Sequence, residues 1–155
     1  QGAHLDGAWA RGQGWSLYGY TMMFRETGDT RYLDRAKKSA GWILAARNTP
    51  EDKIPYWDYA AAGIPNAPRD ASAAAVMASG LLELAQYVDK DFARQCRTRA
   101  VDMLLALSSD EYLAKPGECG GFLLKHSTGH FPENTEIDAS INYADYYFLE
   151  ALSRL

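Results

Sequence analysis

The first fifteen residues place an arginine between two tryptophans, and these residue types suit the binding of an anionic, ring-shaped ligand. Trp9, Arg11 and Trp15 stand at the head of a segment that otherwise fits a buried helix. An arginine in that setting carries five donors that need a carboxylate or carbonyl partner. Indole faces stack on sugar rings, and the polar edge of the indole orients the ligand. The cluster therefore predicts either a sugar pocket or an internal ion pair between Arg11 and an acidic residue.

A second group of candidates precedes and opens a later segment of small residues. Asp70 is a suitable N-cap, because its carboxylate accepts from the N–H groups of the first turn and suits the helix dipole. If that helix points its N-terminus at a central cavity, the same carboxylate faces the ligand. Upstream, the aromatic stretch 56–59 contains Trp57, which is either a sugar platform or a lid over the core. Three weaker candidates lie in the loop before the last helix: His126, His130 and Glu136.

Helices must position these residues, because apolar residues recur along the chain at the spacing of an α-helix. The period predicts five helices, over residues 8–26, from 30 through 43, and over 71–88, 91–107 and 141–152. In order they are buried, amphipathic, buried, amphipathic and buried, which is the pattern of helical hairpins stacked side by side. The connections are long, and long connections at one side of a scaffold commonly carry function. Residues 120–124 are expected to form a short strand.

Composition excludes several classes of function. The chain has 155 residues, enough for one domain, with 47% hydrophobic and 23% charged residues. The net charge of −4 argues against nucleic-acid and anionic-membrane partners. No apolar run approaches the roughly 20 residues of a membrane span. Cys96 is expected to be a buried thiol and Cys119 a loop thiol, with no support for a bridge between them. The histidines lack metal-ligand spacing, and no cofactor motif is present.

The helix pattern predicts an incomplete architecture. Five helices cannot close a ring of paired helices, and buried-type helices at both ends would leave large apolar faces uncovered. The chain also opens on Gln1, with no Met. We therefore expect one domain fragment over 1–155 that is the C-terminal part of a larger barrel, or a chain that pairs with another chain.

Four segments, taken together and in this order, resemble the C-terminal half of the unsaturated glucuronyl hydrolases, glycoside hydrolase family 88. They are Trp9-Ala10-Arg11-Gly12-Gln13-Gly14-Trp15, Tyr56-Trp57-Asp58-Tyr59, Arg69-Asp70-Ala71-Ser72-Ala73-Ala74-Ala75 with Gly80-Leu81-Leu82-Glu83-Leu84, and Tyr143-Ala144-Asp145-Tyr146-Tyr147-Phe148-Leu149-Glu150-Ala151-Leu152. The related rhamnogalacturonyl hydrolases typically have Asn where Gln13 stands. The resemblance therefore favours the glucuronyl group.

The resemblance implies an all-α fold, part of an (α/α)6 barrel, and a glycosidase. Such an enzyme hydrates the C4–C5 double bond of a 4,5-unsaturated glucuronic acid at the non-reducing end of lyase-generated oligosaccharides, rather than attacking the anomeric carbon. Gln1, Arg11 and Trp15 match positions that line the substrate site. The family's two aspartate motifs are absent here, so no catalytic residue is expected in this chain, which alone should be inactive. A bacterial cytoplasm or periplasm suits an enzyme of this kind.

Two other functions fit the same residues. A non-catalytic helical module that binds acidic oligosaccharides needs Trp9, Arg11 and Trp15 but no carboxylate pair. A purely structural helical repeat would use the tryptophan–arginine cluster only for packing. The residues expected to bind substrate are Gln1, Trp9, Arg11, Trp15, Trp57 and Asp70. We expect no metal and no cofactor.

Overall fold

The computed structural model describes residue 2 and residues 7–155, and the regular structure in this part of the chain is helical. The predicted helices are confirmed, with limits that shift by a few residues. The α-helices of the described part are α1 (Ala10–Thr27), α2 (Thr30–Ala45), α3 (Ala71–Leu84), α4 (Lys90–Leu107) and α5 (Asn142–Ser153). The largest shift is at the end of α3, which stops at Leu84 rather than at Val88. The Asp89 side chain caps the start of α4, so the preceding residues must form the turn.

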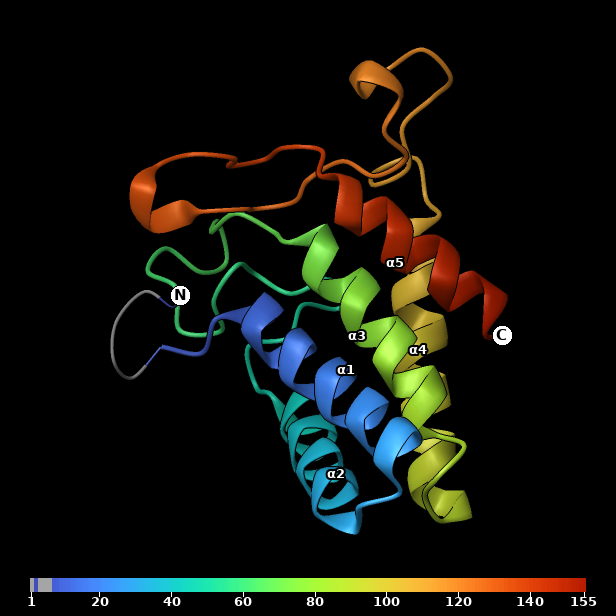
Figure 1. The fold of residues 1–155 in the computed structure, drawn as a ribbon. Helices are drawn as coiled ribbons and strands as arrows, with labels where there is room; N and C mark the ends of the chain where they lie inside the picture. Colours follow the sequence, from blue (N-terminus) through green and yellow to red (C-terminus); the bar gives the residue numbers. More distant parts are fainter. Residues whose placement is uncertain (1, 3–6) are drawn as a thin grey trace.

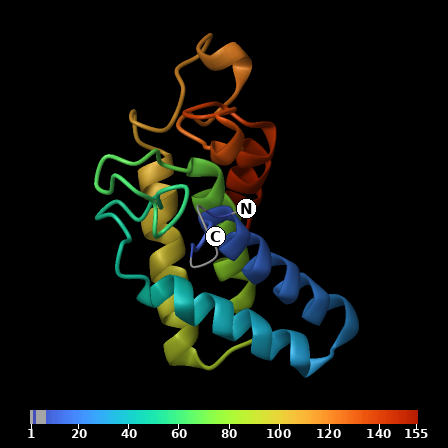
Figure 2. The ribbon, with the colours of Figure 1, turned by 90° about the vertical axis from the view of Figure 1, so that its left-hand side faces the viewer.

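The helices form two layers, with α1, α3 and α5 side by side in one layer and α2 and α4 in the other (Figures 1 and 2). Helix α3 is buried along its whole length because it packs against α1, α4 and α5. Helices α2 and α4 bury one stripe each, as expected for amphipathic partners. Helices α1 and α5 flank α3 and bury only part of their surface. The predicted alternation is therefore confirmed for α2, α3 and α4, but it is wrong for α1 and α5, which flank the layer and leave one face uncovered in the described part.

Helices α1, α3 and α5 run in the same direction, so their N-termini gather at one end of the molecule (Figure 1). Short connections, 28–29 and 85–89, turn the chain at the opposite end. At the first of them Gly28 takes a left-handed φ of 69°, and its N–H donates to the Phe24 carbonyl, as predicted. The long connections, 46–70 and 108–141, lie at the N-terminal end of the three helices.

The prediction of a short strand over residues 120–124 is wrong. Cys119–Gly121 forms a 3-10 turn, in which Gly120 and Gly121 have φ values of 62° and 94°. These left-handed conformations cannot continue an extended strand. Within the described residues only isolated bridges occur, and one of them joins Leu113 to Leu124.

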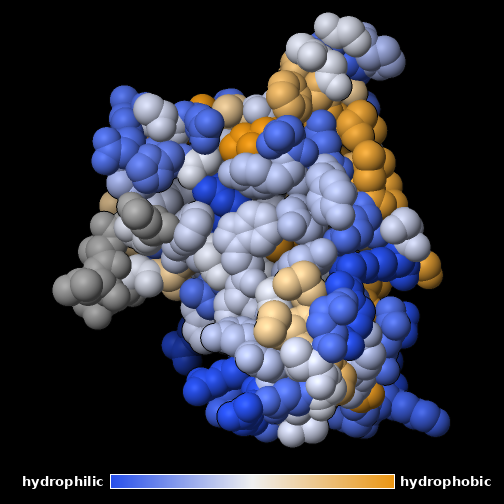
Figure 3. Space-filling model, in the orientation of Figure 1, coloured by the Kyte–Doolittle hydropathy of each residue, from blue (hydrophilic) through white to orange (hydrophobic). Residues whose placement is uncertain are grey.

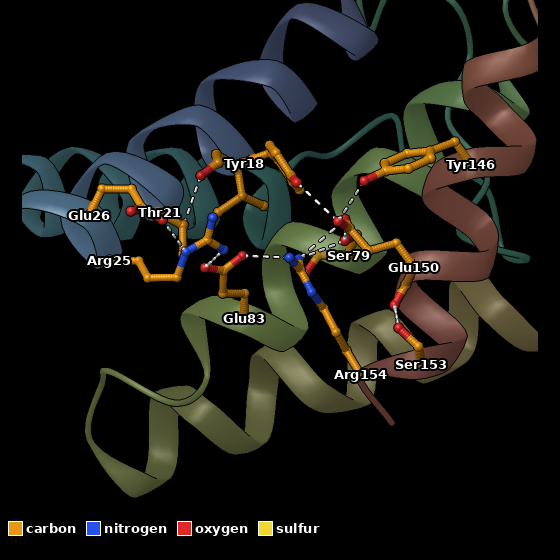
Figure 4. A network of polar contacts seen from close by, with 11 residues as sticks. Tyr18, Thr21, Arg25, Glu26, Ser79, Glu83, Tyr146, Glu150, Ser153 and Arg154 are labelled. Carbon is orange, nitrogen blue, oxygen red and sulfur yellow. Dashed lines mark hydrogen bonds and ion pairs between the residues drawn. The ribbon is translucent and has the colours of Figure 1, made fainter.

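A buried polar network fastens the C-terminal ends of α1, α3 and α5 together (Figure 4). Glu83 of α3 is buried and forms ion pairs with Arg25 at 2.7 Å and with Arg154 at 2.8 Å. Glu150 of α5 accepts from the Ser79 hydroxyl at 2.5 Å and from the Tyr18 hydroxyl at 3.1 Å. Burial, and then Glu150, raise the pKa of Tyr18 to about 12. The three parallel helices are thus locked in register at this end.

Apolar surface remains exposed on both outer helices of the three-helix layer. On α5, Leu149 and Leu152 are exposed, and Figure 3 shows hydrophobic residues gathered along this edge. On α1 a shallow groove of about 420 Å³ runs along the helix. Its lining residues are Gly12, Trp15, Ser16, Gly19, Tyr20, Met22 and Met23. The uncovered apolar faces expected from the sequence are present. No helix in the described part is long and apolar enough to cross a bilayer.

Candidate functional site

Arg11, the second residue of α1, is the centre of the cluster at the N-terminal end of the three helices. Its Nη1 donates to Asp70 Oδ2 at 3.1 Å, to Ser72 Oγ at 3.2 Å and to the Thr128 carbonyl at 2.7 Å. Its Nη2 donates to the Gly129 carbonyl at 2.5 Å. The residue is 4% exposed. The internal ion pair, one of the two alternatives for Arg11, is therefore formed.

Two aromatic rings enclose the guanidinium of Arg11. Its Cζ lies 5.0 Å from the centroid of the Trp9 ring and 5.4 Å from that of Tyr143. Both distances fit cation–π contacts, which are strengthened when the cation is desolvated. Tyr143 follows the start of α5, and the ring centroids of Tyr143 and Trp15 are 6.0 Å apart. Helices α1 and α5 therefore supply the aromatic walls of the cluster, and α3 supplies its carboxylate.

Asp70 is the N-cap of α3, as predicted, and it faces Arg11 rather than open space. Its Oδ1 accepts from the Ser72 hydroxyl at 2.5 Å, from Ala73 N–H at 3.3 Å and from Thr128 N–H at 3.4 Å. Burial raises the pKa of this carboxyl, and the Arg11 charge, the Ser72 hydroxyl and the backbone donors oppose that shift. The carboxylate is fully buried and fully engaged, so its role in the described structure is to hold Arg11 and α3 together.

The loop 126–139 closes over the N-terminus of α3 as a narrow hairpin (Figure 1). Its arms are joined by bridges between Ser127 and Ala139 and between His130 and Thr135. The His126 carbonyl accepts from Ala71 N–H at 3.0 Å. The carbonyls that accept from Arg11 belong to the same arm. This loop therefore supplies acceptors to both α1 and α3.

The weaker candidates from the sequence all lie in this hairpin and serve its own structure. His126 Nδ1 lies 2.5 Å from Asp138 Oδ1, across the two arms. The Glu136 carbonyl accepts from Gly129 N–H at 2.7 Å. His126, Asn134, Glu136 and Asp138 have φ values of 62°, 54°, 51° and 55°. Positive φ is uncommon outside glycine, so the surrounding contacts must hold this loop in its shape.

The predicted tryptophans occupy different environments. Trp15 is partly exposed, and its ring centroid lies 5.2 Å from that of Tyr147. Trp9 is partly exposed and lies over Gly12, where a Cβ would come within 2.7 Å of the indole. Trp57 is only 4% exposed, and Phe131 stacks on it with ring centroids 4.3 Å apart and planes 18° apart. Phe131, not Trp57, therefore presents a ring to the surface. Gln1 lies outside the described residues.

Sequence reasoning missed several members of the cluster. Ser72 and Tyr143 were both within motifs, and their positions at helix N-termini pointed to this end of the molecule. Phe131 could have been noticed as an aromatic residue in a long loop. The carbonyls of Thr128 and Gly129 carry no signal in the sequence, because every residue has a carbonyl.

The arrangement suits binding and orientation of a ligand more than proton transfer. Of the carboxylates in the cluster, Asp70 is engaged by Arg11, and Asp58 is buried and accepts from Ala8 N–H at 2.9 Å and Ala60 N–H at 2.8 Å. In the part of the chain that the structure describes, no group of three or more His, Cys, Asp or Glu residues is placed to hold a metal ion. The accessible features of the cluster are aromatic.

Known proteins resemble the chain over nearly its whole length. No family model matches it. It is 46% identical to an unsaturated glucuronyl hydrolase of Formosa agariphila, over 99% of this chain and 38% of the relative. A crystal structure of an unsaturated glucuronyl hydrolase specific for heparin superposes with a TM-score of 0.95 at 51% identity, over 99% of this chain and 41% of that one. A mutant of the Streptococcus agalactiae enzyme in complex with dGlcA-GalNAc6S superposes with a TM-score of 0.88 at 31% identity, over 99% and 41%.

Proposed function

The chain is homologous to the unsaturated glucuronyl hydrolases of glycoside hydrolase family 88, and we propose that it forms part of the substrate site of such an enzyme. The reaction is release of 4,5-unsaturated glucuronic acid from the non-reducing end of lyase-generated oligosaccharides, by hydration of the C4–C5 double bond. The chain spans about two fifths of the length of the relatives it matches, at 38% and 40% for two curated ones.

One observation carries the proposal: the aromatic and arginine cluster lies at the end of the helices where both long connections gather. Trp9 and Trp15 are partly exposed there and offer ring faces to a sugar. Gln1, Arg11 and Trp15 match substrate-site positions of the family. Arg11 is buried and paired with Asp70, so within the proposed site its guanidinium supports the Trp9 and Tyr143 rings. Asp70 and Trp57 support the site from beneath.

The roles of these residues in the reaction are binding, orientation and exclusion of water. Aromatic faces fix the plane of the unsaturated ring. Holding a reactant in one geometry lowers the entropic part of the activation free energy of its reaction. Hydration of a vinyl ether needs a proton donor and an activated water. We assign no catalytic residue in this chain, because Asp70 is fully engaged by internal partners. We propose that the acid that protonates the double bond lies in the part of the relatives' sequence that this chain does not cover.

The partners follow from the same proposal. The exposed apolar edges on α1 and α5 fit further helices of an (α/α)6 barrel, supplied by the same polypeptide or by a second chain. Residues 1–155 then act as one domain fragment of that barrel. Nucleic acid and membrane are not among the proposed partners, in keeping with the net charge of −4.

The test is binding without turnover by the purified chain. An unsaturated glucuronyl–N-acetylhexosamine disaccharide should bind in calorimetry, while the ultraviolet absorbance of its double bond stays constant. Trp15→Ala should weaken binding, whereas Trp42→Ala, which removes an exposed tryptophan of α2 that packs edge-on against Tyr59, should leave it unchanged. Turnover by the chain alone would contradict the assignment of catalysis elsewhere. Equal binding by both variants would contradict the placement of the site.

A second candidate function is a module that binds acidic oligosaccharides without cleaving them. It would use the same aromatic faces and needs no free carboxylate, which agrees with the engagement of Asp70 by Arg11. The two functions differ in one measurement. A protein that contains this chain together with the remainder of the barrel consumes the double bond under the first function and leaves it intact under the second.

A further inference from the structure

Phe131 is an exposed ring on a rigid support. It opens the short 3-10 turn Phe131–Glu133 and is 37% exposed. One face of the ring rests on the buried Trp57 indole, with centroids 4.3 Å apart. The exposed part of Phe131 is therefore its opposite face and its edge. A phenyl ring presented in this way offers a flat apolar surface of the kind on which sugar rings stack.

The backbone that carries Phe131 is held on both sides. Two residues upstream, the Gly129 carbonyl accepts from Arg11, and Gly129 N–H donates to the Glu136 carbonyl at 2.7 Å. Downstream, Asn134 takes a left-handed φ of 54° and its N–H donates to the Phe131 carbonyl at 2.9 Å. A ligand that meets Phe131 thus encounters a preorganised surface, and little ordering of the loop is needed on binding.

The Phe131 ring is connected to the cluster around Arg11 through Trp57. The Trp57 carbonyl accepts from Ala10 N–H at 3.0 Å, next to Arg11 in α1. Trp9 packs against the small apolar cluster that contains Trp57. Trp9 and Phe131 therefore both rest on the small buried group that contains the Trp57 indole.

We propose that Phe131 is a further ligand-contact residue, which stacks on a pyranose ring of the oligosaccharide held at the Trp9–Arg11–Trp15 cluster. The inference rests on the proposed function, because it places a second contact at the same site. The phenyl ring has no hydrogen-bonding atom, so it recognises the C–H face of the sugar. It therefore suits the neutral hexosamine ring rather than the charged uronate.

The experiment compares two phenylalanines of similar exposure in the same long connection. Phe131→Ala should raise the Kd for an unsaturated glucuronyl–N-acetylhexosamine disaccharide about 3- to 10-fold, the range expected for one aromatic stacking contact. Phe131→Trp should keep the affinity within about 2-fold, since the ring is retained. Phe122→Ala is the matched control, because Phe122 is 38% exposed and lies outside the hairpin.

The outcomes separate this inference from the function on which it rests. Unchanged affinity in Phe131→Ala, with binding by the unsubstituted protein intact, overturns the role of Phe131 alone. Equal weakening by Phe122→Ala also overturns it, since the effect would not belong to this ring. No binding by the unsubstituted protein overturns the proposed function itself, and the Phe131 contact with it. Thermal unfolding of each variant confirms that the fold is retained.

Discussion

Among single residues, Arg11 is the one whose truncation should destabilise the chain most directly. Arg11→Ala leaves the Asp70 carboxylate buried without its cation and frees two carbonyls of the hairpin. Breaking a buried ion pair from one side costs about 3–5 kcal/mol in the free energy of unfolding. Urea denaturation measures the change. Arg31→Ala, which removes an exposed arginine paired with Asp29, should leave the midpoint unchanged. Similar midpoints for the two variants would contradict the structural role of Arg11.

The two cysteines should differ sharply in reactivity. Cys119 is exposed and Cys96 is buried, and both are free thiols in the described structure. Burial raises the pKa of Cys96 from its usual 9.0 to about 11. At neutral pH a thiol reagent should modify Cys119 rapidly and Cys96 only after urea unfolding, as mass spectrometry would show. The linkage has a sign: above about pH 9 the unfolded thiol ionises before the folded one, so this group lowers stability as pH rises. Rapid modification of both thiols in native protein would refute the assignment.

The sequence could predict side-chain roles where local chemistry decides them. Asp70 was identified as an N-cap because its residue type and position suffice, and its carboxylate does accept from Ala73 N–H. An internal ion pair of Arg11 was one of two alternatives, since the need of a buried guanidinium for a carboxylate is general, but its partner Asp70 was not identified. The Phe131–Trp57 stack was not foreseen, because it depends on how two long connections fold over one another. Whether these residues contact substrate remains a prediction.

At the scale of the helices, the packing of α1 against α3 depends on Gly80. A Cβ at this position would lie 3.0 Å from the Leu17 side chain and 3.3 Å from the Tyr18 backbone. Gly80→Ala should therefore destabilise the chain by about 1–3 kcal/mol despite the better helix propensity of alanine. Gly19→Ala is the matched variant in α1, since nothing lies within 4 Å of its Cβ position, and it should stabilise by up to about 1 kcal/mol. Thermal unfolding compares them, and equal shifts would contradict close packing at Gly80.

The helices were predictable and the connections were not. Apolar residues at helical spacing, with Gly28 and Asp70 at helix ends, specify elements through interactions within a few residues. The limits of α3 shifted because Asp89 captures the first N–H groups of the next helix, a competition that periodicity does not weigh. The expected strand failed because Gly120 and Gly121 adopt left-handed conformations. The apolar run Phe122-Leu123-Leu124 that follows them does not report such backbone states.

At the scale of the whole molecule, the exposed edge of α5 predicts self-association. Contiguous apolar surface on a soluble chain favours association with another apolar surface. Sedimentation velocity should show a weight-average mass that rises with concentration, and substitution of Leu149 and Leu152 by Glu should suppress the rise. Leu105→Glu is the control, because Leu105 is exposed on α4, in the other layer. A concentration-independent monomer before substitution would count against an open edge.

The contact between Arg11 and the Thr128 carbonyl spans 117 residues of sequence. This separation determines which parts of the chain can fold first during translation. Helices α1 and α2 are joined by a two-residue turn and can pair while the rest of the chain is still being translated. The carbonyls of Thr128 and Gly129 can accept from the Arg11 guanidinium only after the hairpin has left the ribosome. The cluster at the helix N-termini is consequently among the last parts of the chain to become ordered. A nascent chain that stalls before residue 128 would contain the paired helices but would lack the complete binding surface.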